Sequence, residues 1–422
     1  MSLRTKDHLS KATLYATLNA LKRPFIWLAG QPRYKSKISY SDAEIASRPI
    51  TGINLSTGAP YSANVYGDGT HDDKSVLQTA LNTCGLIKVP AGTYILSGTL
   101  TIPSIDGAGI IGDGAGLLSE QSSSGGTVFK ASFGRGDIIQ CPTHLTHAMF
   151  RGFVLDRSVT ATSGSGLNTS ISSDGAVIDD VWSLHSDVGF TFSTCGYGVI
   201  SNCRASSNVS HGFSIVGQWQ TSKCYSNSNG GCGFYVAGQL SPNGNSLGQY
   251  TGLSTYANSS HGIYFDGSSL AVHDIRLSDS FFGGDGGHGV YDDSYSSGPN
   301  TYTNVFVESE ADGFHITANT NAVQFVNCTA TGNTQNGLKS WSPVTLVTGG
   351  TFSGHSATNS YGVWFVQGKG SIIGANITGN WCGVGGSVGV TAMTCLGNRC
   401  SGNSSMDFDT SAASNVTLYA NY

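Results

Sequence analysis

The stretch His261-Gly-Ile-Tyr-Phe265 is one copy of the five-residue motif that decides the fold. The motif is a polar residue, glycine, an apolar residue, any residue and a second apolar residue. Its glycines recur 21 to 29 residues apart, at Gly189, Gly212, Gly233, Gly262, Gly289, Gly313, Gly337 and Gly362. A helical repeat of this length would not tolerate so many glycines. Two or three short strands fill such a period, which is the length of one coil of a β-solenoid.

The motif also predicts which side chains face the interior. Equivalent residues of stacked coils lie ~4.8 Å apart, and successive residues of a strand point to opposite sides. The residues one and three places after the glycine, such as Phe213 and Ile215, should therefore fill a continuous core. We expect the glycine to allow a tight turn into the strand. A β-propeller is the alternative fold, but its period is longer and each blade needs four strands.

Composition agrees with many short strands and excludes several classes of protein. Of the 422 residues, 39% are apolar, only 11% are charged and 58 are glycine, and the net charge is −5. A nucleic-acid-binding protein would usually show a basic face, which this chain lacks. No run is long and apolar enough to span a bilayer. The cysteines form no CxxC pair with a matching His or Cys set, so we expect no metal and no cofactor.

The segment before the repeats has a different pattern. Tyr66-Gly-Asp-Gly-Thr-His-Asp-Asp73 is followed by Ser75-Val-Leu-Gln-Thr-Ala-Leu-Asn82, whose apolar residues are spaced as on one face of a helix. Asp72 and Asp73 are expected to cap this helix at its N-terminus, rather than to bind a metal. Lys88-Val-Pro-Ala-Gly-Thr-Tyr-Ile-Leu96 then predicts a turn into a strand.

This run resembles the start of the pectate-lyase-like and polygalacturonase-like β-helix, which bacteriophage tailspikes and capsule depolymerases share. The resemblance implies an all-β, right-handed parallel β-helix over residues 61–422, closed at its N-terminal end by the helix. For phage spikes it also implies a homotrimer. Residues 1–60 are then expected to be a short helical attachment segment that binds a phage tail or baseplate protein. The resemblance does not fix the reaction, because the fold hosts lyases, hydrolases, epimerases and adhesins.

Outward positions of the repeats carry the residues expected to bind a ligand. The residue two places after the glycine, or the one just before it, is aromatic, histidine or lysine in the middle coils. These candidates are Tyr235, Tyr264, Tyr291, His315, Lys339, Trp364, His261 and His288. Exposed rings suit sugars, because they offer apolar faces to C–H surfaces and polar tips to hydroxyls. Alternatively, the rings pack against a neighbouring subunit or stack on one another as a sheet ladder.

Four carboxylates are the candidate catalytic groups. Asp266 and Asp293 occupy the same outward column on adjacent coils, which suits the ~5–5.5 Å carboxyl spacing of retaining glycosidases. Glu310 and Asp312 follow a turn that looks shortened, so we expect them at the edge of the same surface, nearer the inverting spacing. Any single acid is more often a solvated or turn-capping group. Asp292 is at an inward position, which suggests a bulge or register change there.

Together these features predict a phage tailspike-like depolymerase that hydrolyses a bacterial surface polysaccharide, either capsule or O-antigen. Such a protein would be part of the virion or otherwise secreted, and it would act at the host cell surface. Two alternatives stay open. One is a spike that binds the glycan without cleaving it. The other is a polysaccharide lyase, in which a His or Tyr abstracts the proton next to the carboxylate of a uronic acid.

Overall fold

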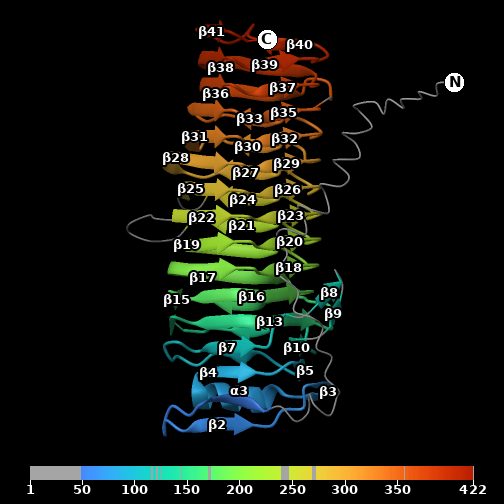
Figure 1. Ribbon diagram of the computed structural model, residues 1–422, viewed down its shortest axis with the longest axis vertical. Helices are drawn as coiled ribbons and strands as arrows, with labels where there is room; N and C mark the ends of the chain where they lie inside the picture. The colour runs from blue at the N-terminus through green and yellow to red at the C-terminus, as the bar shows by residue number, and fades with distance from the viewer. Residues whose placement is uncertain are drawn as a thin grey trace, which may run out of the picture. The chain divides into compact units, whose positions relative to one another are not determined.

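The computed structural model describes residues 49–421, except residues 116, 120, 121, 125, 144, 170–172, 239–246, 269–271 and 356. In this part the chain is a parallel β-helix of stacked coils, which confirms the predicted all-β fold (Figure 1). Most of the attachment segment predicted for residues 1–60 lies outside the described residues, and its boundary at residue 61 stays a prediction. No helix in the described ranges is long and apolar enough to cross a membrane.

Three parallel sheets run along the stack, and each coil contributes one strand segment to each of them. Sheet 1 consists of β3 (Asp68–Asp72), β5 (Gly92–Leu96), β10 (Thr127–Ala131), the second parts of β13 (Met149–Arg157) and β16 (Val177–Leu184), β18 (Arg204–Ser206), β20 (Tyr225–Asn227), β23 (Ser254–Tyr256), β26 (Phe281–Gly283), β29 (Phe306–Glu308), β32 (Thr329–Thr331), β35 (Thr351–Ser353), β37 (Asn376–Thr378) and β39 (Arg399–Ser401).

Sheet 2 contains the repeated motif. It consists of β6 (Leu100–Thr101), β11 (Ile139–Gln140), β14 (Ser165–Thr169), the first parts of β17 (Val188–Ser201) and β19 (Phe213–Ser222), β21 (Phe234–Ala237), β24 (Ile263–Asp266), β27 (Val290–Asp293), β30 (Phe314–Ile316), β33 (Leu338–Ser340), the first parts of β36 (Tyr361–Ile373) and β38 (Cys382–Leu396), and β40 (Met406–Asp409).

Sheet 3 closes each coil. It consists of β4 (Leu86–Val89), β7 (Gly109–Gly112), the first parts of β13 and β16, the second parts of β17 and β19, β22 (Leu247–Thr251), β25 (His273–Ser278), β28 (Ser296–Thr303), β31 (Thr320–Val326), β34 (Val344–Thr348), the second parts of β36 and β38, and β41 (Val416–Tyr419). The remaining short strands are β1 (Ile50–Ile53), β2 (Pro60–Ala63), β8 (Leu117–Ser119), β9 (Ser122–Ser124), β12 (Leu145–Thr146) and β15 (Ser173–Asp174).

The N-terminal end of the stack is covered by α3 (Lys74–Cys84), as predicted (Figure 1). Leu77, Ala80 and Leu81 form its buried face. Asp72 accepts the backbone N–H of Lys74 at 3.1 Å, which confirms it as a turn and cap residue. The expectation that Asp73 caps the helix through its side chain is wrong, because its carboxylate instead accepts the backbone N–H groups of residues 66 and 67.

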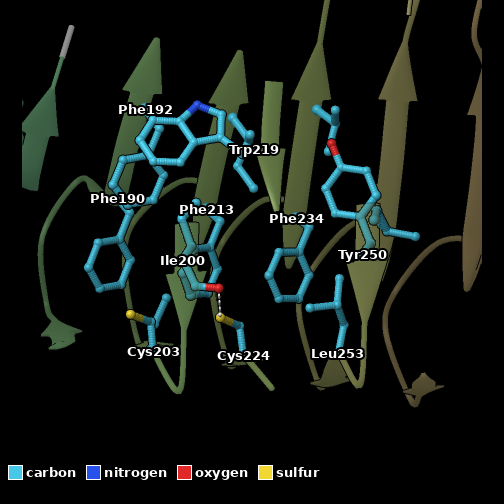
Figure 2. Packing of buried hydrophobic residues seen from close by; sticks show 14 of the residues in the cluster. Phe190, Phe192, Ile200, Cys203, Phe213, Trp219, Cys224, Phe234, Tyr250 and Leu253 are labelled. Carbon is cyan, nitrogen blue, oxygen red and sulfur yellow. Dashed lines mark hydrogen bonds between the residues drawn. The ribbon is translucent and has the colours of Figure 1, made fainter. Parts of the chain in front are cut away.

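Stacked aromatic rings form the centre of the core (Figure 2). The ring of Phe213 lies 4.8 Å from that of Phe190 on the preceding coil and 4.7 Å from that of Phe234 on the next, with the rings nearly parallel. All three side chains are fully buried, which is worth about 1.5–3 kcal/mol each in transfer free energy. Cys203 and Cys224 are buried thiols in successive coils, so they continue the core.

A ladder of polar side chains runs inside the stack where sheet 1 turns into sheet 2. Each ladder side chain accepts the backbone N–H of the equivalent residue on the preceding coil, at 2.8–3.2 Å. The ladder consists of Asn208, Asn229, Asn258, Asp285, Glu310, Asn333, His355, Asn380 and Asn403. These bonds satisfy backbone donors that the turn would otherwise bury without partners.

The ladder explains the glycine of the motif. A Cβ on Gly212 would collide with Ser226 and would lie 2.9 Å from Asn229 Nδ2, and a Cβ on Gly313 would lie 2.8 Å from Asn333 Nδ2. None of the eight motif glycines has a positive φ. The expectation that glycine serves a tight turn is therefore wrong. It is needed because a Cβ would press on the carbonyl oxygen of the glycine in the next coil and on buried side chains, which include the ladder residue at seven of the eight positions.

Asp292 belongs to the interior of the stack. It is fully buried and pairs in regular register with Phe265 and Ile316, so the predicted bulge is absent at this position. Its carboxylate accepts hydrogen bonds from Tyr302 Oη at 2.6 Å and Asn300 Nδ2 at 2.9 Å. These partners come from the next segment of the same coil and make an inward carboxylate tolerable.

Candidate functional site

The outward side chains of sheet 2 form one continuous surface, which we call the motif face. It comprises Tyr235, Tyr264, Tyr291, His315, Lys339 and Trp364, with Asp266 and Asp293 beside them. The register of the strands places the first six on successive coils in a single column, as predicted. Each of these side chains is partly exposed. A chain-like ligand that runs along the stack would therefore meet an aromatic or polar group at every coil.

Asp266 and Asp293 end adjacent strands and are directly paired. Asp266 accepts a hydrogen bond from the Tyr235 hydroxyl and another from Ser268 N–H at 2.9 Å. Burial alone would raise the pKa of Asp266, but hydrogen bonds from Ser268 and Tyr235 outweigh it and lower the pKa below its ordinary value. Asp266 is therefore ionised at neutral pH.

Asp293 accepts its hydrogen bonds from the next coil, whereas Tyr235 reaches Asp266 from the preceding one. The Thr317 hydroxyl and Asn319 Nδ2, the latter at 2.8 Å, donate to the same carboxylate oxygen, Oδ1. Both donors come from the turn that follows β30, one coil further on. Sequence reasoning missed Asn319, because it lies beyond the motif. Its only sequence signal is its position two residues after Thr317, which follows β30 at the position equivalent to Asp293.

Glu310 does not reach the motif face. Its side chain is 1% exposed, and it forms a rung of the internal ladder, where Oε1 accepts Asp285 N–H at 3.0 Å. The expectation that it stands at the edge of the outer surface is wrong, because the chain bends inward at this turn. Burial and the nearby Asp285 raise the pKa of Glu310 to about 9. The same burial raises the pKa of Asp285 to about 6.

Asp312 is also buried, at 0% exposed, so its predicted place on the outer surface is wrong. It lies directly beneath His315, whose Nδ1 is 2.7 Å from Asp312 Oδ2. Asn336 donates to the other carboxylate oxygen through its backbone N–H and Nδ2. Burial opposes ionisation, but the hydrogen bonds from His315 and Asn336 lower the pKa of Asp312. Asp312 thus orients His315 with Nδ1–H toward the carboxylate, which leaves Nε2 as the atom that takes or gives a proton.

The histidines just before the motif glycine have a structural role. Nδ1 of His261 accepts the backbone N–H of His288, and Nδ1 of His288 accepts that of Asp312, at 3.0 and 3.1 Å. Both rings therefore carry their proton on Nε2. Burial lowers the pKa of His261 to about 4 and that of His288 to about 3, with the nearby His315 adding to each shift. The 3.5 Å approach of His288 Nδ1 to Asp312 Oδ2 is consequently not an ion pair.

Stacking joins these rings into one aromatic surface. The rings of His261 and Tyr291 are 4.7 Å apart and nearly parallel, and those of His288 and His315 are 4.3 Å apart. Trp341, which the sequence places four residues after a motif glycine, extends the surface at 5.0 Å from His315. The predicted ladder-like stacking is thus present, and the sugar-facing role of the rings stays a prediction.

One group of side chains has the composition of a metal site. His288, Asp312 and His315 place nitrogen and oxygen atoms within 4.8 Å of one another. Nδ1 of His288 is already occupied by a backbone N–H, and Nδ1 of His315 donates to Asp312. Both Nδ1 atoms thus have hydrogen-bond partners, and Asp312 orients the His315 ring.

Comparison with known proteins supports the fold. No family model matches the chain, and no curated protein matches it. Among solved structures, the pre-mature gene product 12 of bacteriophage phi29 matches with 16% identity and a TM-score of 0.50, over 84% of this chain and 55% of that one. The A-module of a mannuronan C-5 epimerase from Azotobacter vinelandii matches with 16% identity and a TM-score of 0.46, over 83% of this chain and 97% of that one. The catalytic unit of an α-1,3-glucanase from Streptomyces thermodiastaticus matches with 13% identity and a TM-score of 0.45, over 84% and 67%.

Proposed function

We propose that the chain is a tailspike-like depolymerase that binds a bacterial surface polysaccharide along the motif face and hydrolyses it with Asp266 and Asp293. The observation that carries the proposal is the direct pairing of these two carboxylates beside an unbroken column of tyrosines. Sugar rings would stack on Tyr235, Tyr264 and Tyr291. Capsule and O-antigen are the candidate polysaccharides.

Glycoside hydrolysis requires two carboxyl groups, and the two here accept hydrogen bonds from different coils. Hydrogen bonds from Tyr235 and Ser268 keep Asp266 ionised. One of the two carboxylates would act as the nucleophile or the base, and the other would protonate the leaving oxygen. Paired residues of adjacent parallel strands are ~4.8 Å apart, which is close to the ~5–5.5 Å carboxyl spacing of retaining enzymes.

The Asp312–His315 pair favours a second candidate, a polysaccharide lyase. His315 Nε2 would abstract the proton next to a sugar carboxylate, and Asp312 would stabilise the imidazolium that forms. This reaction differs from hydrolysis in its product, because elimination leaves an unsaturated sugar that absorbs ultraviolet light. A glycan-binding spike without catalysis would give neither product.

The assembly that we propose is a homotrimer in a phage virion, bound to the tail or baseplate through residues 1–60. The likeness in fold to a bacteriophage gene product supports the phage part of this proposal. A secreted protein with the same face would act on the same polysaccharide. Sedimentation analysis of the full chain tests the trimer, and a trimer mass is the expected result.

The test of the reaction is chain length and reducing-end analysis of purified capsule and O-antigen polysaccharides after incubation with the protein. We expect shorter chains with wild type and no shortening with Asp266→Asn or Asp293→Asn. Asp279→Asn is the matched control, because Asp279 is an exposed carboxylate that lies outside the motif face. Unsaturated products that disappear in His315→Gln would instead establish the lyase.

A further inference from the structure

Lys339 is the only lysine or arginine in the segments that form sheet 2, within the described ranges. It lies in the column of the motif face, paired with His315 on one side and Trp364 on the other. Its Nζ is 4.5 Å from the ring centroid of Trp341 and 4.9 Å from that of Trp364. The ammonium group is thus held between two indole rings.

This arrangement fixes a cation without neutralising it. Cation–π contacts are worth about 0.5–1 kcal/mol at exposed sites, and they restrict the rotamers of the long lysine side chain. No described carboxylate forms an ion pair with Lys339. Its N–H donors therefore remain for a ligand. An ion pair with an aspartate would stabilise a purely structural lysine as well as two indole rings do. Arg151 has such a partner in Asp179 at 3.2 Å, and Lys339 does not.

We infer that Lys339, Trp341 and Trp364 form a subsite for a carboxylated sugar. The ammonium group would bind the carboxylate, and one indole face would pack on the C–H surface of the sugar ring. The inference deepens the proposed function and rests on it, because it names the chemical class of the polysaccharide: an acidic one.

The subsite lies apart from the proposed catalytic pair. β30 separates β27, which ends with Asp293, from β33, which carries Lys339, so the two are two coil steps, or roughly 10 Å, apart along the stack. A carboxylate next to Asp266 and Asp293 would be repelled by them. The sugar at the catalytic pair should therefore be neutral and the sugar at Lys339 acidic, which requires a polysaccharide that contains both kinds.

The experiment compares binding and cleavage of acidic bacterial polysaccharides with those of the same polysaccharides after chemical reduction of their carboxyl groups to alcohols. The proteins are wild type, Lys339→Gln, Lys339→Arg and, as a matched control, Lys369→Gln. Lys369 is an exposed lysine on sheet 3. Circular dichroism melting confirms that each variant folds.

We expect wild type to bind one acidic polysaccharide at least ten times more tightly than its reduced form. Lys339→Gln should lose this preference, Lys339→Arg should keep most of it, and Lys369→Gln should leave it unchanged. Equal binding of both forms by wild type, with no effect of Lys339→Gln, would overturn the subsite even if chains are shortened. Lysine-dependent binding without any shortening would support the subsite and remove the hydrolase. If wild type bound neither the acidic nor the reduced form of any polysaccharide, the subsite and the proposed function would both be overturned.

Discussion

Replacement of Glu310 by glutamine should remove a large pH dependence from the stability of the protein. Glu310 is buried in the internal ladder, and burial together with Asp285 raises its pKa from 4.5 to about 9. The folded state therefore holds a proton that the unfolded state releases above pH 4.5. The contribution of Glu310 to the free energy of unfolding is therefore fully present below pH 4.5. It is lost as the pH rises toward 9, because the unfolded state binds fewer protons than the folded state over this range.

The size of the effect follows from the same values. Each pKa unit corresponds to about 1.36 kcal/mol, and pH 7 is 2.5 units above the unfolded pKa of 4.5. Glu310 should therefore make the free energy of unfolding lower at pH 7 than at pH 4 by on the order of 3 kcal/mol. Glutamine has the same shape, and its Oε1 can still accept Asp285 N–H. The free energy of unfolding of Glu310→Gln should therefore exceed that of wild type by an amount that grows with pH.

Urea unfolding at pH 4, 5.5, 7 and 8.5 measures this difference directly. Glu308→Gln is the matched control, because Glu308 is two residues away but reaches the surface. Its difference from wild type should vary little with pH. Parallel curves for Glu310→Gln and wild type from pH 4 to 8.5 would refute the reasoning and mean that Glu310 is not held neutral in the ladder.

Three further predictions concern the stack itself. Phe213→Ala should lower the free energy of unfolding by about 3–5 kcal/mol, because it opens a cavity between two stacked rings, and Ser214→Ala on the outer side should change it far less in the same thermal melts. Gly212→Ala should yield little folded protein, because its Cβ would collide with Ser226, whereas Gly98→Ala, with nothing within 4 Å, should express as wild type does. His261→Gln should reduce the loss of stability on acidification: the folded pKa of His261 is lowered to about 4, so its contribution is present above pH 6.5 and is lost as the pH falls to about 4. Urea midpoints of this variant that track wild type from pH 7 to pH 4 would contradict that account.

The repeat predicted most of the architecture. The spacing of the glycines gave the coil length, and strict alternation around them placed Phe213 inside and Tyr264 outside, because the period of a strand is two. Asp266 and Asp293 were paired correctly for the same reason. The helix before the first coils followed from local apolar spacing, which needs no knowledge of distant contacts.

The errors lie where alternation ends. Glu310 and Asp312 precede the strand β30, in a turn where the chain bends inward, so a rule for strands does not apply to them. Their partners are residues about 25 positions away on the neighbouring coils, such as Asp285 and Asn336. The ladder has its own sequence signal, an asparagine four residues before four of the eight motif glycines. Its substitution by Asp, Glu and His at three rungs hides that signal in the coils that carry the motif face.

The measurement that tests the central claim most directly is the reducing-end assay on a panel of acidic capsule and O-antigen polysaccharides with wild type, Asp266→Asn, Asp293→Asn and Asp279→Asn. The proposed function predicts new reducing ends and shorter chains with wild type and Asp279→Asn, and neither with the other two variants. Shortening that survives in both Asp266→Asn and Asp293→Asn would contradict the assignment of the catalytic pair. Tight binding of a polysaccharide by wild type without any new reducing end would contradict the enzyme itself.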